Sequence, residues 1–265
     1  MSPDYIELSF GQVAIAAALI LISGAVSLAL QLGLEKRLLI ASVRTVVQLL
    51  LIGLVLEWIF KVAQWPAVLG IMLVMTLIAG VSAVRRTERR YRGVWLDSVL
   101  SIMASSWIIA AIALVAIIRV HPWYQPQYAI PLLGMILGNT LNGISLGLER
   151  FGEELAARRD QVETLLALGA TRWEAARTAI QKAVRTGMVP MINSMMIVGV
   201  VSLPGMMTGQ ILAGMSALQA VMYQIVIMFL LAAGTALGTV GVVMLGYGRL
   251  FTRDHQFRFE RLTNK

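Results

Sequence analysis

The sequence predicts an all-α integral membrane protein. Of its 265 residues, 58% are hydrophobic and only 14% are charged, whereas a soluble domain is about one quarter charged. The mean hydropathy is +0.78. The apolar residues fall in seven blocks close to the roughly 20 residues that a helix needs to cross a bilayer. These blocks cover residues 10–32, 38–60, 67–84, 94–118, 129–148, 188–212 and 218–246.

Lys and Arg predict the orientation of these seven spans. Nineteen of the 22 basic residues lie in the loops on one side, whereas Lys61 and Arg119 lie on the other side and Arg44 lies within a span. Because cytoplasmic loops carry the excess of positive charge, we expect a cytoplasmic C-terminus and an external N-terminus. Basic loops at the membrane edge explain the net charge of +8, so we expect no nucleic-acid partner.

The chain contains no linker-like stretch, and we expect one integral domain over residues 1–265. It has no Cys, which excludes disulfides and thiolate metal sites. The only large cytosolic segment is 149–190. Its residues 152–168 have a helical composition, and Gly169 suits a helix end, where a positive φ costs glycine little. Thr171 and Glu174 fit a capping box that starts a second helix. We therefore expect helix, tight turn and helix, with the second helix leading into the span 188–212.

No pattern typical of an active site occurs. The sequence has no Gly-Lys pair and therefore no P-loop. Its two histidines, His121 and His255, lie in a predicted loop and in the C-terminal tail, and no span holds a central Asp, Glu or His. A proton-coupled transporter usually keeps an ionisable residue at depth. We expect no enzymatic activity, no cofactor in this chain and no proton coupling.

Polar and helix-breaking residues within the spans mark a candidate translocation path. Arg44 and, one turn on, Gln48 either anchor the second span or line a cavity. Asn139 and Asn142 of the fifth span either hold helices together or line the path. Pro204 and Gly205 should break the sixth span, and backbone broken at depth is buried in protein or lines a cavity. Two further polar residues follow this break, Thr208 and Gln210.

Methionines crowd the same sixth span, from Met188 to Met215. Thioethers bind Cu(I), but methionine is also a flexible packing residue. Packing, or an adaptable cavity wall, is the interpretation that we prefer.

Two resemblances add to this interpretation. The stretch Glu163–Gly169 is similar to the Glu-Ala-Ala…Gly loop by which permeases of ABC importers dock their ATPase, although Thr164 and Leu165 replace the two alanines. A longer resemblance covers nearly the whole chain, which resembles the FetB-type permeases, bacterial iron-export ABC subunits related to plant aluminium-tolerance proteins. The stretches that carry it are LEKRLLIASVRTVVQLLLIG (34–53), IPLLGMILGN (130–139), LALGAT (166–171) and VSLPGMMTGQILAG (201–214).

The resemblance implies a homodimeric permease of the bacterial inner membrane that binds a separate ATPase, which would hold ATP and Mg²⁺. It implies iron export, metal homeostasis and resistance to oxidative stress. The expected ATPase-coupling residues are Glu163, Leu168, Gly169, Ala170, Thr171 and Glu174. The resemblance also adds Ser202 and Gln224 to the candidate path.

The cargo and the role leave alternatives open. Fe²⁺ prefers imidazole and carboxylate ligands, which the centres of the spans lack. Another metal, a chelate or a nucleotide sugar is therefore an alternative cargo. A membrane receptor that recruits a cytosolic partner without transport is the alternative from another class.

Overall fold

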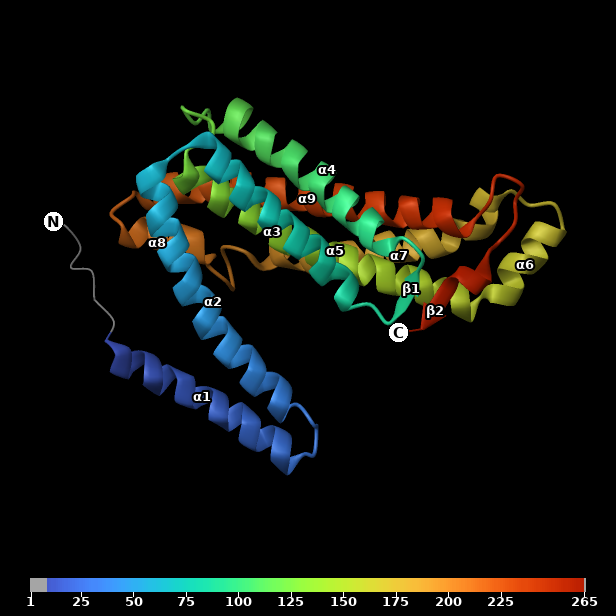
Figure 1. Ribbon diagram of the computed structural model, residues 1–265, viewed down its shortest axis with the longest axis horizontal. Helices are drawn as coiled ribbons and strands as arrows, with labels where there is room; N and C mark the ends of the chain where they lie inside the picture. The colour runs from blue at the N-terminus through green and yellow to red at the C-terminus, as the bar shows by residue number, and fades with distance from the viewer. Residues whose placement is uncertain (1–8, 265) are drawn as a thin grey trace. The chain divides into compact units, whose positions relative to one another are not determined.

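The computed structural model describes residues 9–264, and most of them lie in helices (Figure 1). The contacts divide the chain into two compact units. The first ends at Ala63 and includes Leu212–Gly214, and the second consists of Gln64–Ile211 and the residues from Met215 onward. The expectation of a single domain therefore stays a prediction.

The first unit is a pair of helices, α1 (Phe10–Ala29) and α2 (Glu35–Val62). The turn between them is fixed by Ser27, whose hydroxyl accepts the Leu34 N–H at 3.1 Å and donates to Glu35 Oε1 at 3.0 Å. Nearly all side chains of both helices are exposed, and a helix that is apolar all round suits a lipid environment. Arg44 and Gln48 are exposed on α2, and their place on the path stays a prediction.

The second unit is a helical bundle centred on α5 (Pro126–Ala157). Helix α5 packs against α3 (Trp65–Arg85), α4 (Val94–Ala111), α7 (Arg172–Ile197) and α9 (Ala217–Leu250). A π-helical turn (Ile112–Ile117) extends α4. The shorter helices are α6 (Arg159–Ala167), α8 (Gly205–Leu212) and a 3₁₀ turn (Phe259–Arg261). Two short strands, β1 (Arg89–Tyr91) and β2 (Leu262–Asn264), pair antiparallel.

Six helices of the described chain are long and apolar enough to cross a membrane, namely α1, α2, α3, α4 with its π turn, α5 and α9. They correspond to six of the seven predicted blocks, so the all-α, multi-pass class is confirmed. The block 188–212 is instead divided, because α7 ends at Ile197 and α8 begins at Gly205. The count of seven spans and the orientation stay predictions.

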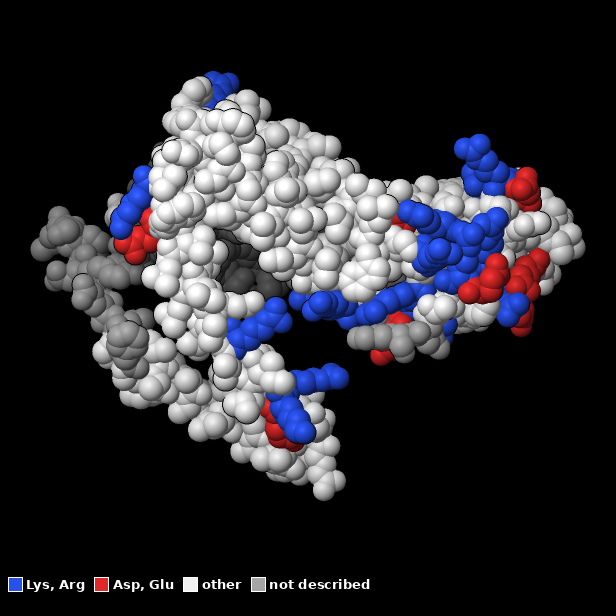
Figure 2. Space-filling view, viewed as in Figure 1, with Lys and Arg blue, Asp and Glu red and all other residues white. Residues whose placement is uncertain are grey.

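Charged side chains of the second unit gather at the end that holds β1, β2 and α6, which we call the basic end, while the middle of the bundle is uncharged on the face shown (Figure 2). At this end the buried Asp97 of α4 pairs with Arg249 of α9, with Oδ1 to Nη2 at 2.8 Å and Oδ2 to Nε at 3.1 Å. Burial, and then the Asp97 carboxylate, raise the pKa of the neighbouring Tyr91 far above its usual value, so this hydroxyl stays protonated.

Glycine allows α5, α7 and α9 to approach closely. A Cβ added to Gly187 of α7 would lie 2.6 Å from the backbone oxygen of Gly143 in α5 and 2.6 Å from Cγ2 of Thr239 in α9. A Cβ on Gly143 would lie 2.6 Å from the Thr239 hydroxyl oxygen. Small residues at such crossings let helix backbones pack directly against one another in a membrane.

We predict that Gly187→Ala destabilises the protein, because the new methyl group meets backbone that must shift. Overpacking of this kind costs about 1–3 kcal/mol, measured as the free energy of unfolding or the thermal midpoint in detergent. Gly138→Ala is the matched control, since nothing lies within 4 Å of a Cβ at Gly138. Equal stability of the two variants would contradict the close three-helix contact.

Candidate functional site

The predicted helix–turn–helix is present at the basic end. Helix α6 ends in a Schellman arrangement, in which the Ala170 N–H donates to the Leu165 carbonyl at 3.0 Å and the Gly169 N–H to that of Leu166 at 3.1 Å. Gly169 has φ +92°, a conformation that glycine adopts without strain. The first predicted helix differs in one respect: α5 continues to Ala157, and Arg158 (φ −113°, ψ 23°) separates it from α6.

Thr171 and Glu174 form the predicted capping box at the start of α7. The Thr171 hydroxyl accepts the Glu174 N–H at 3.3 Å, and Glu174 Oε2 accepts the Thr171 N–H at 2.8 Å. The Thr171 N–H, followed by its hydroxyl, lowers the pKa of the Glu174 carboxyl. The carboxylate therefore stabilises the turn above the usual Glu pKa, and this contribution is lost only as the pH falls through the lowered value.

The turn Leu168–Thr171, which we call the docking turn, presents an apolar side chain to the surface. Leu168 is 79% exposed, and Trp173 on the first turn of α7 is also exposed. Ala170 is half-buried. Within α6, Glu163 forms an ion pair with Arg159, with Oε1 of Glu163 2.8 Å from Nε of Arg159. A rigid, doubly capped turn with an exposed leucine at its tip is suited to contact with another protein.

At the other end of α7 the backbone leaves the helix for seven residues. Gly199, with φ +83°, turns the chain, and its N–H donates to the Ser202 carbonyl at 2.9 Å. Pro204 has no N–H to continue a helix, and it disfavours helical backbone at the residue before it. The predicted break is confirmed, but it begins at Val198, before the Pro204–Gly205 pair, and α8 starts at Gly205.

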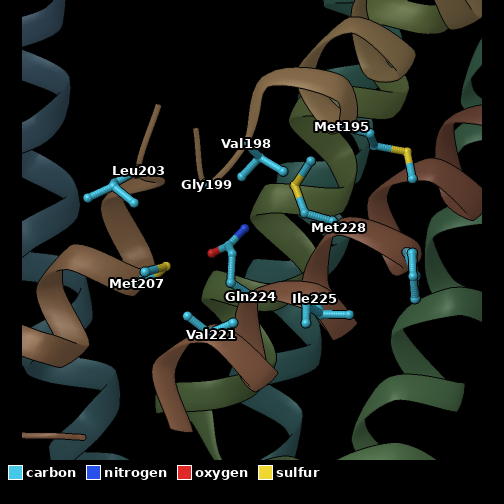
Figure 3. A pocket seen from close by; sticks show the side chains of 10 residues that line it. Met195, Val198, Gly199, Leu203, Met207, Val221, Gln224, Ile225 and Met228 are labelled. Atoms are coloured by element: carbon cyan, nitrogen blue, oxygen red, sulfur yellow. The ribbon is translucent and has the colours of Figure 1, made fainter. Parts of the chain in front are cut away.

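Five of the predicted path residues meet at this break. One cavity of about 340 Å³ is lined by Asn139 of α5, Ser202 and Pro204 of the break, Gly205 at the start of α8 and Gln224 of α9. A second cavity of about 550 Å³ adjoins it and shares Val198, Gln224 and Met228 (Figure 3). The remaining lining of both cavities is apolar except for Ser194, and it is rich in methionine.

Gln224 is the polar centre of the two cavities. Its side chain points into the space between Val198, Gly199 and Met207 (Figure 3). The residue is 7% exposed, and the described residues offer its Oε1 no hydrogen-bond partner. Asn139 is satisfied locally, because Nδ2 donates to the Met135 carbonyl at 3.0 Å. Gln224 is therefore free to accept a hydrogen bond or to face a weakly bound cation.

Neither cavity is lined by an ionisable side chain. Among residues 9–264, no group of three or more His, Asp or Glu is placed to hold a metal ion. The site can offer amide and backbone oxygens, hydroxyls and thioethers. Such donors suit a weakly held or neutral ligand better than a tightly coordinated Fe²⁺.

The other predicted path residues of the second unit lie outside this site. Asn142 is exposed and accepts from Arg86 Nη1 at 2.8 Å, so its amide serves a contact between α3 and α5. The Thr208 hydroxyl donates a hydrogen bond to the Pro204 carbonyl at 3.2 Å. Gln210 lines neither cavity, and its Oε1 is buried without a partner among the described residues.

The sequence interpretation missed several lining residues, although a signal for two of them existed. Met135 lies four residues before Asn139, and Met228 lies four residues after Gln224. Residues four apart share a helix face, so each predicted polar residue indicated its neighbouring methionine. Met191 belongs to the methionine-rich stretch that the sequence analysis interpreted as packing or an adaptable cavity wall, whereas Ser194 had no marker.

A family model described as an uncharacterised protein family, UPF0014, matches residues 10–251. The chain belongs to the UPF0014 family. It is 42% identical over 225 residues to the UPF0014 membrane protein slr1647 of Synechocystis, a match that covers 85% of this chain and 87% of that protein. No solved structure matches the chain.

Two further relatives have names that refer to metals. The probable iron export permease protein FetB of Escherichia coli is 31% identical over 95% of this chain and 96% of its own length. Protein ALUMINUM SENSITIVE 3 of Arabidopsis thaliana is 32% identical over 94% of this chain and 90% of its own length. The resemblance to FetB-type permeases is confirmed at the level of the family, and the protein is a multi-pass membrane protein of that family.

We predict that Gln224→Met does not destabilise the protein and raises its unfolding free energy by about 1 kcal/mol, since an unpaired buried acceptor costs about 1–3 kcal/mol. Thermal unfolding in detergent measures the change. Gln181→Met, at an exposed position of α7, is the control and should have no effect. A clear loss of stability in Gln224→Met alone would mean that the Gln224 amide is paired in the protein.

Proposed function

We propose that the protein is the permease subunit of an ABC transporter and moves a metal-related cargo out of the cell. A separate ATPase would bind at the docking turn and hold ATP and Mg²⁺, and this chain would carry no cofactor and no catalytic site. The working unit would be a homodimer in the bacterial inner membrane, with the basic end in the cytoplasm. Iron export is the role suggested by the name of the FetB relative. Metal homeostasis and resistance to oxidative stress would follow from iron export and are part of this proposal.

The observation that carries this proposal is the course of α7. This single helix of 26 residues starts at the capped docking turn and ends at the break that lines both cavities. At about 1.5 Å per residue it spans about 39 Å. A partner that pushes on Leu168 or Thr171 would therefore displace the wall of the cavity without any intervening loop.

The chemistry of the cavity bears on the cargo. Uncharged amide, hydroxyl and thioether groups line it, whereas Fe²⁺ prefers imidazole and carboxylate ligands. This favours an iron chelate, another metal or an organic cargo such as a nucleotide sugar over tightly bound Fe²⁺ as the transported species. The non-transporting receptor role is an outcome of the binding experiment below.

We predict that Leu168→Asp prevents the ATPase from binding while the protein still inserts and folds, because the Leu168 side chain is almost fully exposed. Loss of an apolar anchor at an interface costs about 2 kcal/mol or more in binding. The measurement is affinity purification of the tagged protein in mild detergent with an ATPase assay of the co-eluting protein.

Gln161→Asp is the control, since it adds the same charge at an exposed position of α6 and should leave the ATPase bound. Gly169→Asp should abolish ATP-driven transport, because it combines a charge with a backbone conformation that only glycine adopts easily. A co-purifying ATPase that Leu168→Asp leaves in place would contradict docking at this turn. A partner without ATPase activity would favour the receptor role.

We predict that Gln224→Met slows ATP-dependent transport by about tenfold, equivalent to about 1.4 kcal/mol, because it removes a buried side-chain acceptor that lines both cavities and has no partner among the described residues. Efflux of radiolabelled iron from proteoliposomes that contain the permease and its ATPase is the measurement, with free Fe²⁺ and iron citrate tested separately.

Thr235→Val is the matched control. It also removes a buried hydroxyl that has no partner among the described residues, but Thr235 lines neither cavity. Unchanged transport in Gln224→Met would exclude this cavity from the path. Movement of iron citrate without movement of free Fe²⁺ would identify the chelate as the cargo.

A further inference from the structure

The C-terminal residues 251–264, which we call the brace, return from the end of α9 along α6 and the start of α7 to β1 (Figure 1). The brace opens with a tight hairpin, in which the Thr252 N–H donates to the Gln256 carbonyl at 2.9 Å and the Arg258 N–H to the Leu250 carbonyl at 2.8 Å. Nothing in the proposed function so far uses this segment.

His255 connects the hairpin to the docking turn. Its Nδ1 accepts the backbone N–H of Arg172, the first residue of α7, at 2.9 Å. The first N–H groups of a helix have no partner within the helix, so the imidazole caps α7 beside the capping box. His255 adopts a left-handed backbone with φ +56°, which is uncommon for a residue other than glycine and aims the ring at α7.

A row of aromatic rings continues this contact. Trp173, which follows Arg172, packs edge-on against Tyr247 of α9, with the ring centroids 5.9 Å apart. The ring centroids of Tyr247 and Phe251 are 5.4 Å apart. Phe251 and Phe257 stack at 4.9 Å. Phe257 in turn meets Phe259, whose ring lies 4.4 Å from the guanidinium carbon of Arg159 in α6. The brace thus touches both helices that flank the docking turn.

The far end of the brace is tied to the segment between α3 and α4. Strand β2 pairs with β1 in the register Arg90↔Thr263 and Tyr91↔Leu262. The Thr263 hydroxyl donates to the Arg90 carbonyl at 3.1 Å. Tyr91 is itself packed against Gly246 of α9. One short segment therefore joins α6, α7, α9 and the α3–α4 connection.

We propose that the brace holds the docking turn in a fixed position relative to α9 and the α3–α4 connection, so that they move as one body when the partner acts. His255 and Phe259 are positioning residues in this arrangement, because they act through Arg172 and Arg159 and leave Leu168 free. The inference rests on the proposed ABC permease function for its transport consequences, but its structural half can be tested without any partner.

The partner-free test is hydrogen–deuterium exchange on the purified permease. His255→Ala removes the acceptor for the Arg172 N–H, and amides of the docking turn and of the first turn of α7 should then exchange faster. His255→Asn should restore protection, because asparagine tolerates a positive φ and carries an acceptor oxygen at a similar position. Gln256→Ala, an exposed neighbour, is the control. Unchanged exchange in His255→Ala would overturn the proposal.

The functional test compares cargo moved per ATP hydrolysed in proteoliposomes with the ATPase. His255→Ala and Phe259→Ala should keep the ATPase bound but lower this ratio by about 5- to 10-fold, the size of a typical coupling between sites. His255→Asn should restore the ratio, whereas a merely destabilised protein would lose binding and coupling together. A wild-type ratio, or loss of ATPase binding in His255→Ala, would overturn the brace as a positioning element.

Because the chain has no Cys, a disulfide within one copy of the double variant Arg90→Cys/Thr263→Cys can form only between these two paired positions, and non-reducing electrophoresis separates it from disulfides between copies. Cross-linking without the ATPase would show that the pairing exists in the membrane, whatever becomes of the proposed function. If the brace moves as one body with β1, the cross-linked protein should transport as well as its reduced form. Transport that stops on oxidation and returns on reduction would mean that the brace must open.

Discussion

The close contact of α5, α7 and α9 at Gly143, Gly187 and Thr239 constrains how α7 can move. With the Gly143 oxygen only 2.6 Å from where a Gly187 Cβ would lie, the helices are in backbone contact and leave no room for independent rotation. Gly187 is fifteen residues from Arg172 and ten from Ile197, or about 22 Å and 15 Å at 1.5 Å per residue. Packed contacts of this kind switch between discrete arrangements rather than deform smoothly, so displacement at one end of α7 is delivered to the other.

The polar character of the bundle supports the same geometry. Serine and threonine hydroxyls without partners among the described residues lie in α4, α5 and α9, at Ser101, Ser106, Thr140, Thr235 and Thr239. Four of them border glycines: a Cβ on Gly241 would meet Ser101, one on Gly238 would meet Thr140, and one on Gly143 would meet both Thr235 and Thr239. Small hydroxyl residues serve close helix packing in membranes at little cost. With these small residues in its contacts, most of α9 packs closely against its neighbours, while the unpaired amide of Gln224 on the same helix lines the cavity.

How much the sequence could predict depended on the range of each interaction. Apolar length predicted the spans, and Thr171, Glu174 and Gly169 predicted the docking turn, because each signal is complete within a few residues. The β1–β2 pairing joins Arg89 to Asn264 across most of the chain, and three-residue strands at a charged end carry no hydrophobic alternation. Asn142 was selected for its polarity, but Arg86, 56 residues earlier, determines its contact. The break was expected at Pro204–Gly205 and begins at Val198, because Gly199 adopts the positive φ first.

The separation of charge in the second unit constrains how any transport could be driven. Lys, Arg, Asp and Glu gather at the basic end (Figure 2), and the described residues that line the two cavities are uncharged. An ion gradient acts through charged groups within the membrane, and these cavities offer none. Under the proposed function, energy would enter through a surface and arrive as movement. The surface suited to receive it is the docking turn, because its Leu168 is exposed and its caps make it rigid. From this turn α7, which contains Pro190, continues as a single helix to the break.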